Sequence, residues 1–339
     1  MAEKYPSANG LWSDDANWNG GVKPTTGDTA HANGYTITLD EDVTCDMITT
    51  TAGATASAGG EFDNPTTGNP ITLTCNILAG STPCVDYNNH THRLVVVGDI
   101  TGSSTTNSKM GIDFNGSAGG HITGTLTSGN KTSTQAVSYF QGTVIGDIYQ
   151  GGGNAAYGLH TAYGHVDVTG DMYGGSDATS AAVNITGVGT ATIVGDAYGG
   201  TASNAWGLMN SSNGIVTMDG TAYSSATSSA VWSNPAKASG VIVTAMDYNG
   251  SDFFPASGKV FFANDASLVS LTVEQEDGSE LIMDDASQSG TPDYPAEADV
   301  SEGVSYAYGA KTGTAELTTG QIIDGVAKVV GDTLASNIP

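Results

Sequence analysis

The chain is poor in basic residues. Only 9 of its 339 residues are Lys or Arg, against 35 Asp or Glu, so its formal net charge is −26. Binding to nucleic acid needs clustered Lys and Arg side chains that neutralise phosphates, and attraction to anionic lipid needs the same side chains. We therefore expect neither a nucleic-acid partner nor a membrane partner. An acidic surface of this kind suits a particle exterior or a saline medium.

Cysteine is scarce, and long apolar runs are missing. Three cysteines are present, Cys45, Cys75 and Cys84, and an odd number argues against a disulfide framework. No apolar stretch approaches the ~18 residues of a membrane-spanning helix, and the first residues lack the apolar core of a secretion signal. We expect a protein made in the cytosol that leaves it, if at all, by lysis or by a dedicated route.

The sequence does contain a repeat, marked by the pattern apolar-x-small-Asp-apolar. Its spacing is 22–30 residues, and the small residue (position 0) is Cys45, Cys75, Gly98, Gly124, Gly146, Gly170, Gly195, Gly220 and Ala245. The residue two positions earlier is apolar in every copy, and the residue two positions later in all but one. A period of this length indicates a solenoid, in which stacked repeats bury a common core.

The alternation within the repeat predicts strands, because strand side chains point to opposite faces in turn. Positions −2, 0 and +2 are expected to point inward, and positions +1 and +3 outward. A second apolar series predicts another strand in each repeat: Ile112, Val137, Leu159, Val183, Leu208 and Val231. The predicted fold is an all-β parallel β-helix of about nine rungs. A β-sandwich with regular turns is the alternative, but it does not demand the same inward register in every copy.

The chain divides into four regions by composition. Residues 1–44 are an N-terminal cap, in which Trp12 and Trp18 are expected to seal the open end of the solenoid; stacking on sugar is the other interpretation of these tryptophans. Residues 45–250 form the solenoid, and 251–285 a closing β region. Residues 286–339 are a linker and an anchoring tail, whose apolar spacing over 319–334 predicts a short amphipathic helix.

Two outward columns are the candidate functional residues. The tyrosines at position +3 are Tyr149, Tyr173, Tyr198, Tyr223 and Tyr248. We expect them to pack against another subunit or a particle surface; glycan stacking and self-stacking under a loop are the alternatives. At position +1 stand Asp147, Asp171 and Asp196. Carboxylates in a row suit Ca²⁺, but we favour a solvated stripe in which each Asp bonds the backbone at a bend. No other cofactor is expected.

Catalytic signals are weak. Glycoside hydrolysis needs two carboxylates at a defined separation, and among so many acids some pair always fits. A polysaccharide lyase needs a base over a calcium site, but the cluster His90, His92 and Arg93 does not recur with the repeat, nor do His121, His160 and His165. The expectation is a protein that is not an enzyme.

Two segments carry a resemblance. The entry segment runs Asn9-Gly-Leu-Trp12, then Trp18-Asn-Gly-Gly, Pro24, Gly27-Asp28 and Asn33-Gly-Tyr-Thr-Ile-Thr-Leu-Asp40. The tail contains Asp299-Val-Ser-Glu-Gly-Val-Ser-Tyr306 followed by Gly309-Ala-Lys-Thr-Gly-Thr314. Together these segments resemble virion structural proteins of marine and environmental tailed phages, although related entry segments occur in other extracellular β-helix proteins.

The resemblance implies a role on the virion exterior and transfers no catalytic residue. We expect a non-enzymatic capsid decoration or head-fibre subunit, a homo-oligomer with a trimer favoured, that attaches to major capsid or tail proteins. One alternative is a tail spike or fibre that binds, or cleaves, host-surface glycan. A bacterial surface protein, such as a filament or adhesin, is the second alternative.

Overall fold

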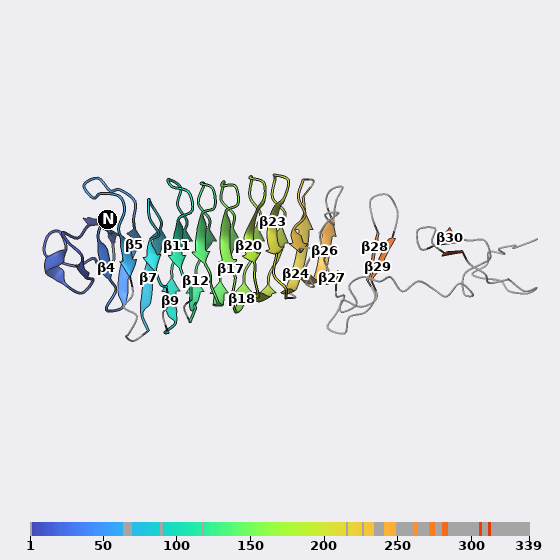
Figure 1. Ribbon diagram of the computed structural model, residues 1–339, viewed down its shortest axis with the longest axis horizontal. Coiled ribbons are helices and arrows are strands. Elements are labelled where there is room, and N and C mark those ends of the chain that lie inside the picture. Colours follow the sequence, from blue (N-terminus) through green and yellow to red (C-terminus); the bar gives the residue numbers. More distant parts are fainter. Residues whose placement is uncertain are drawn as a thin grey trace, which may run out of the picture.

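The predicted parallel β-helix is confirmed. The computed structural model describes residues 2–63, 70–88, 91–116, 118–214, 216–225, 227–233 and 241–248, together with short strands further along the chain. Parallel strands stack into a rod whose rungs follow one another in sequence order (Figure 1). The described residues contain no α-helix and one short 3₁₀ helix, η1 (Asp15–Asn17).

Two parallel sheets run along the rod. The larger sheet has 17 strands: β1 (Ala2–Lys4), β3 (Asp28–His31), β5 (Val43–Thr49), β7 (Thr72–Leu78), β9 (Leu94–Val97), β10 (Ile100–Thr101), β12 (Gly120–Thr123), β13 (Leu126–Thr127), β15 (Gly142–Ile145), β16 (Ile148–Tyr149), β18 (His165–Thr169), β19 (Met172–Tyr173), β21 (Thr190–Val194), β22 (Ala197–Tyr198), β24 (Val216–Ser224), β26 (Val241–Tyr248) and β27 (Phe261–Phe262). The second sheet has ten: β2 (Gly10–Leu11), β4 (Thr36–Thr38), β6 (Glu61–Asp63), β8 (Val85–Asp86), β11 (Met110–Asp113), β14 (Gln135–Ser138), β17 (Tyr157–Thr161), β20 (Ser180–Ile185), β23 (Ala205–Asn210) and β25 (Val231–Ser233).

A middle rung contributes three strands. In one rung these are β12, β13 and β14, and each pairs in parallel with its counterpart one rung later, β15, β16 and β17. The register carries the predicted apolar series: Ile122 pairs with Val144, and Val137 with Leu159. The second apolar series is therefore a separate strand of each rung, as predicted.

The core is an apolar bore that continues from rung to rung. One cluster of buried side chains extends from Trp12 to Val241, and it includes the residues at −2 and +2 of each middle repeat, such as Val144 and Ile148, which are fully buried. Burying an aliphatic side chain of this size contributes about 1.5–3 kcal/mol. Stability is therefore spread along the rod as a sum of neighbouring rung contacts.

Position 0 differs from the prediction. In the middle rungs this glycine lies at a bend between two short strands, and it does not point into the bore. Its φ lies between 143° and 151° at Gly98, Gly124, Gly146, Gly170 and Gly195. A Cβ built on Gly170 would lie 2.2 Å from the carbonyl oxygen of Gly146 in the preceding rung. The glycine is thus required because neighbouring rungs approach closely at this corner. Among the copies whose burial is described, Cys45 and Cys75 alone are buried as expected.

The end of the solenoid departs from the simple repeat. A register shift between Met218 and Thr221 pairs Tyr223 with Asp247 and Ser224 with Tyr248. Further on, β28 (Leu271–Glu274) and β29 (Glu280–Met283) form an antiparallel pair within the predicted closing β region, and β30 (Ser305–Tyr306) pairs with β31 (Lys311–Thr312). The predicted linker over 286–299 and the helix over 319–334 lie outside the described residues.

Candidate functional surfaces

The aspartates at position +1 bond each rung to the next. We call Asp99, Asp147, Asp171 and Asp196 the Asp column. Oδ1 of Asp147 accepts a hydrogen bond from the backbone N–H of Asp171 at 3.0 Å, and Oδ1 of Asp171 accepts one from Asp196 at 2.9 Å. Asn76 does the same for the N–H of Asp99 at 2.9 Å. The bend at the glycine interrupts the backbone hydrogen bonds between strands, so the N–H of the following residue needs another acceptor. The side-chain oxygen at position +1 of the preceding rung provides it.

The tyrosines at position +3 stack directly on one another. We call Tyr149, Tyr173, Tyr198 and Tyr223 the Tyr column. Its successive ring centroids are 4.6, 4.8 and 4.8 Å apart, and the rings are within 6° of parallel. Because neighbouring rings occupy each other's faces, the column offers mainly ring edges to solvent. The tyrosine rings thus stack on one another. Within the column a sugar cannot stack on a ring face, because a neighbouring ring already covers it.

Tyr248 stands apart from this column in register, since β26 pairs it with Ser224. Its side chain lies outside the described part of the structure. In the column itself, three hydroxyls bond the aspartate two residues earlier: Tyr149 donates to Oδ2 of Asp147 at 3.4 Å, Tyr173 to Asp171 at 3.2 Å and Tyr198 to Asp196 at 3.3 Å. Tyr223 has Thr221 at that place. Partial burial, and then the negative charge of Asp196, raise the pKa of Tyr198 to about 12. Tyr198 therefore stays a neutral hydrogen-bond donor at physiological pH.

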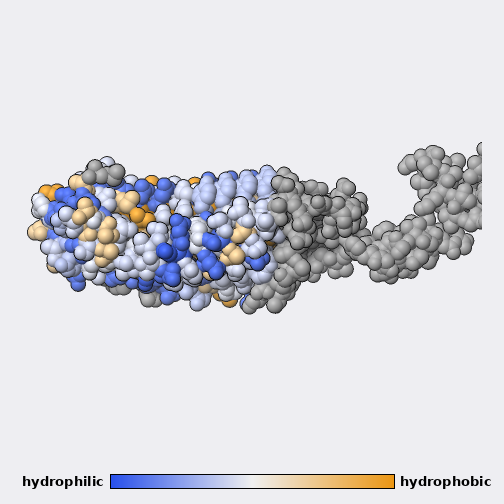
Figure 2. Space-filling model, turned by 90° about the horizontal axis from the view of Figure 1, so that it is seen from above, coloured by the Kyte–Doolittle hydropathy of each residue, from blue (hydrophilic) through white to orange (hydrophobic). Residues whose placement is uncertain are grey.

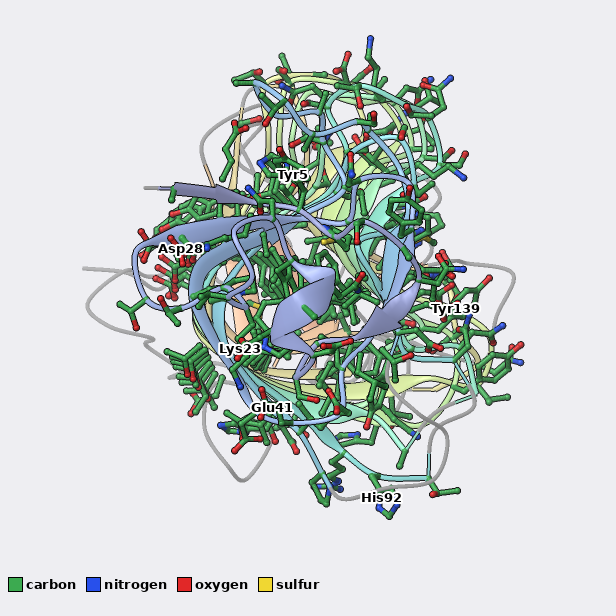
Figure 3. All side chains as sticks on the ribbon, turned by 90° about the vertical axis from the view of Figure 1, so that its left-hand side faces the viewer. Tyr5, Lys23, Asp28, Glu41, His92 and Tyr139 are labelled. Carbon is green, nitrogen blue, oxygen red and sulfur yellow. The ribbon has the colours of Figure 1, made fainter. Side chains whose placement is uncertain are left out.

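In Asp147, Asp171 and Asp196, both oxygens of the carboxylate accept a hydrogen bond. One oxygen of each accepts a backbone N–H, and the other accepts a tyrosine hydroxyl. No group of three or more His, Cys, Asp or Glu side chains that converges on a metal position occurs among the described residues. The arrangement of the described carboxylates matches the backbone-bonding interpretation of the stripe. In Figure 3, which looks along the rod, Asp28 and Tyr139 lie on opposite sides of it.

The two tryptophans of the cap are interior residues. Trp12 is 1% exposed and Trp18 is 2% exposed; their rings meet edge to face at 5.1 Å, and the indole N–H of Trp18 donates to the carbonyl oxygen of Trp12 at 3.0 Å. Trp12 also packs against Phe62 in the second sheet. With both indoles buried in the core cluster, neither presents a ring face on which a sugar could stack.

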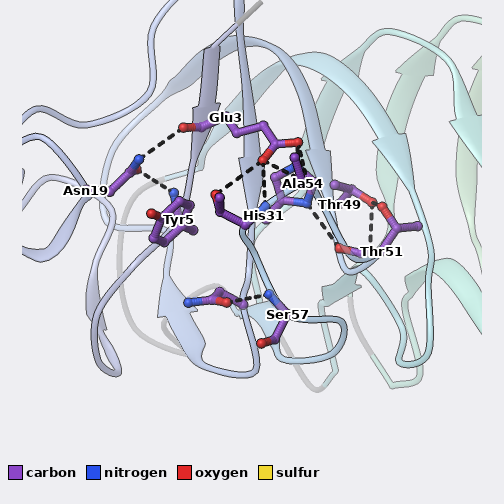
Figure 4. Close-up of polar contacts among 10 residues, drawn as sticks. Glu3, Tyr5, Asn19, His31, Thr49, Thr51, Ala54 and Ser57 are labelled. Atoms are coloured by element: carbon purple, nitrogen blue, oxygen red, sulfur yellow. Dashed lines mark hydrogen bonds and ion pairs between the residues drawn. The ribbon is translucent and has the colours of Figure 1, made fainter.

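A polar pocket, not anticipated from the sequence, lies where β1 meets the first rungs (Figure 4). Its cavity of about 290 Å³ is lined by residues that include Glu3, His31, Thr49 and Thr51. Glu3 accepts hydrogen bonds from the backbone N–H groups of Ala54, at 2.8 Å, and Thr55. The bond from Ala54 is the main cause that lowers the pKa of Glu3. The sequence signal was slight, because the partners are about fifty residues apart.

The contacts in this pocket join two segments of the chain, which indicates a structural role. Nε2 of the buried His31 is 4.0 Å from a carboxylate oxygen of Glu3, and its Nδ1 lies 3.0 Å from the carbonyl oxygen of Thr51. The hydroxyls of Thr49 and Thr51 are 2.9 Å apart, and that of Thr49 bonds the carbonyl oxygen of Leu78. The carboxylate and the imidazole therefore tie the N-terminal strand to the loop after β5.

The cysteines form a second small feature near this end. Cys45 and Cys75 line an open cavity of about 400 Å³, and all three cysteines are free and buried. A hydrogen bond with Cys45, followed by burial, raises the pKa of Cys75 well above its usual value. Burial also raises the pKa of Cys84. The thiols of Cys75 and Cys84 are therefore protonated at neutral pH, and they are poor nucleophiles and poor metal ligands.

The outer face of the second sheet carries an aromatic cluster that sequence reasoning missed. Trp206 and Trp232 stack at 5.2 Å, and Tyr157, Ala181 and Met209 pack with them outside the bore. Nearby, Tyr139 and Tyr163 stack at 6.3 Å, and Tyr163 is 58% exposed. The aromatic type does not recur at one position of the repeat, so the periodic pattern could not reveal the cluster.

His160 lies at the edge of this cluster. Its ring centroid is 5.2 Å from that of Tyr139, and its Nε2 is 3.1 Å from the hydroxyl oxygen of Thr186. Burial lowers the pKa of His160 to about 4. The imidazole is therefore neutral at physiological pH, and its Nδ1 has no hydrogen-bond partner among the described residues.

Comparison of the chain with protein-family models, curated proteins and solved structures finds no match. No helix in the described part is long and apolar enough to cross a membrane. The face of the rod seen in Figure 2 is mostly hydrophilic or neutral, with hydrophobic residues in small separate groups. The fold and its surfaces are thus the basis for any functional conclusion.

Proposed function

We propose that this protein is a non-enzymatic structural subunit on the exterior of a tailed-phage particle, a capsid decoration or head-fibre rod that works as a homo-oligomer. The entry and tail segments that resemble such proteins support the proposal, as does the strongly acidic composition, which keeps a projecting rod soluble. One terminus would anchor the rod on the capsid or tail, and the solenoid would set how far it projects.

The observation that carries the proposal is the repeated corner. The four rungs that contain Gly146, Gly170, Gly195 and Gly220 are joined in succession by strand pairing, by an Asp carboxylate that bonds the next backbone N–H, and by stacked tyrosine rings. These devices recur at the same position and stiffen the molecule along one axis. The repeated geometry of the corners therefore gives the rod its length and rigidity, and a spacer or fibre requires both.

The test is to locate the chain in the particle. Particles of the phage that encodes the chain would be purified on a density gradient, analysed by quantitative mass spectrometry, and labelled with gold-conjugated antibody for electron microscopy. We expect a fixed copy number per particle and label on the outer surface. Recovery of the chain only in the soluble lysate fraction would overturn the proposal.

A second candidate function, a tail spike or fibre that binds host-surface glycan, is favoured by one specific observation. Tyr139 has a φ of 55°, which is unusual for a bulky residue, and its ring stacks with the exposed Tyr163. Backbone strain that holds an aromatic ring at the surface is a recognised pointer to function, and aromatic faces stack well on sugars. On a glycan array we expect binding that Tyr163→Ala abolishes and that Val22→Ala, at an exposed aliphatic residue of the N-terminal cap, leaves intact. Absence of binding by the unmodified protein would exclude this candidate.

A further inference from the structure

The larger sheet carries an exposed stripe without charge. At position −1 of six consecutive rungs, threonine alternates with an aliphatic residue, and the strand register places each next to the following one. This uncharged stripe consists of Thr74, Val97, Thr123, Ile145, Thr169 and Val194. Its aliphatic members are 45%, 43% and 49% exposed in chain order. At ~4.8 Å per rung the stripe is about 24 Å long.

This stripe carries no charge, on a chain with a net charge of −26. The stripe ends at Asp219, which pairs with Val194 one rung later. On one side it borders the Asp column. On the other side lies the position −3 series, Val95, His121, Thr143, Asp167 and Thr192, in which Asp167 is the single acid. Charged residues are therefore kept off one flat strip of sheet while acids border it.

We propose that this uncharged stripe is the contact surface between two copies of the chain, packed side by side with their sheets face to face. The proposal rests on the homo-oligomeric structural role proposed above and assigns its interface. Identical copies of so acidic a chain repel one another wherever acids meet, so their contact must lie where acids are absent. The central part of a homodimer interface is depleted of charge in the same way, and β-branched side chains on a flat sheet pack well against their like.

The position of the Asp column also indicates how the two rods are oriented. If a two-fold axis runs along the rods, which then point the same way, the Asp column of each copy faces the position −3 series of its partner. If the rods point in opposite directions, the two Asp columns lie on the same side of the interface and face each other. Like charges placed opposite one another across an interface cost binding energy. The parallel arrangement is therefore the one that the charge pattern favours.

The first experiment adds one charge to the stripe. The full-length protein and its Ile145→Asp and Val188→Asp variants would be compared by sedimentation over a range of concentrations. Val188 is a matched control because it is an exposed aliphatic residue, 66% accessible, away from the stripe. We expect Ile145→Asp to weaken self-association roughly 100-fold and Val188→Asp to leave it unchanged, with thermal unfolding showing that both variants fold. A native chain that is monomeric at every concentration, or an unaffected Ile145→Asp variant, would overturn the interface.

The second experiment tests the orientation by cross-linking. Thr123→Cys and Val194→Cys would each be treated separately with a thiol-reactive cross-linker that spans the ~10 Å between packed sheets; both positions lie outside the cavity of Cys45 and Cys75. In the parallel arrangement each new cysteine faces its own copy, and both variants form cross-linked dimers. In an antiparallel pair two positions three rungs apart, about 14 Å, cannot both lie near the two-fold axis, so at most one variant is cross-linked. Cross-linking of only one variant, or of neither, would overturn the parallel pair.

These results are separable from the test of the proposed function. A monomeric chain that is nevertheless found on particles would overturn the interface and leave the structural role intact. A chain that self-associates through the stripe but is absent from particles would do the reverse.

Discussion

The carboxylate of Asp171 accepts the backbone N–H of Asp196 in the following rung at 2.9 Å. These two aspartates have like charges, yet they lie next to each other because the side chain of Asp171 accepts a hydrogen bond from the backbone of Asp196. Its other oxygen accepts the hydroxyl of Tyr173 at 3.2 Å. Gly170, Asp171 and Tyr173 together form one corner of a rung, and corners of this kind recur along the rod.

The first prediction concerns the acceptor in this corner. Asp171→Ala removes the partner of the Asp196 N–H and should lower the free energy of unfolding by about 1–3 kcal/mol, since an unpaired, partly buried donor costs that much. Asp171→Asn should keep stability within about 0.5 kcal/mol, because Asn76 already performs the same role for Asp99. Urea unfolding followed by circular dichroism measures both. Equal losses in the two variants would show that charge, and not the acceptor, matters.

The second prediction concerns the bend. Gly170→Ala places a Cβ 2.2 Å from the carbonyl oxygen of Gly146 at a φ of 148°, so the two rungs must separate; we expect a loss of about 3 kcal/mol or more. Gly21→Ala is the control, because Gly21 also has a positive φ, 67°, but its Cβ would meet nothing within 4 Å. This control should lose only about 1 kcal/mol. Similar melting temperatures for the two variants would contradict the close approach of rungs.

The third prediction is a pH dependence that comes from His160. Burial lowers its pKa from 6.5 to about 4, so between these values the unfolded chain binds a proton that the folded chain does not. Its contribution to stability is present above pH 6.5 and is lost as the pH falls towards 4, by up to about 3 kcal/mol. Urea unfolding of the native protein and of His160→Gln should differ in slope only within this window.

Acidic groups elsewhere also titrate below neutral pH and change the stability of both proteins. The prediction is therefore tested by the difference between the native protein and His160→Gln, and the pH dependence of one protein alone does not test it. Parallel stability profiles for the native protein and His160→Gln would show that the imidazole is hydrated in the folded state. His165, which is exposed and lies 3.1 Å from Asp167, provides the matched control: His165→Gln should leave the His160 contribution in place.

The sequence was sufficient for the fold and for the apolar register, and the reason is physical. Residues at −2 and +2, such as Val144 and Ile148, must be apolar in every rung because a solenoid has no other place to bury them. The position of Gly146 could not be obtained in this way, because strict alternation places it inward. A φ near 150° lets the chain turn there and restart the alternation after the bend. The glycine that recurs at this position is compatible with a bend, but residue type does not tell on which side of the sheet it lies.

The surfaces were only partly predictable, for the same reason. The Asp and Tyr columns were visible because hydrogen bonding and stacking demand the same residue type in successive rungs. The cluster around Trp206 and His160 was not visible, because its members differ from rung to rung and meet only through the register of the second sheet. The pocket of Glu3 and His31 joins distant segments, and Tyr248 was assigned to the Tyr column because the register shift after Met218 has no signature in the repeat.

The last prediction concerns the ionisation of the Tyr column. Partial burial and the charge of Asp196 raise the pKa of Tyr198 from 10.0 to about 12. Partial burial raises the pKa values of Tyr149 and Tyr173 as well, together with the charges of Asp147 and Asp171. Between pH 10 and 12 the unfolded chain loses protons that the folded chain keeps, so the stabilisation is full below pH 10 and is lost as the pH rises through 12. Tyrosinate absorbance of the folded protein should therefore show a late phase that urea-unfolded protein lacks. Tyr198→Phe should reduce this phase, whereas Tyr163→Phe, outside the column, should leave it unchanged. A late phase that survives Tyr198→Phe undiminished would mean that Asp196 and the stacked rings do not hold the hydroxyl as described.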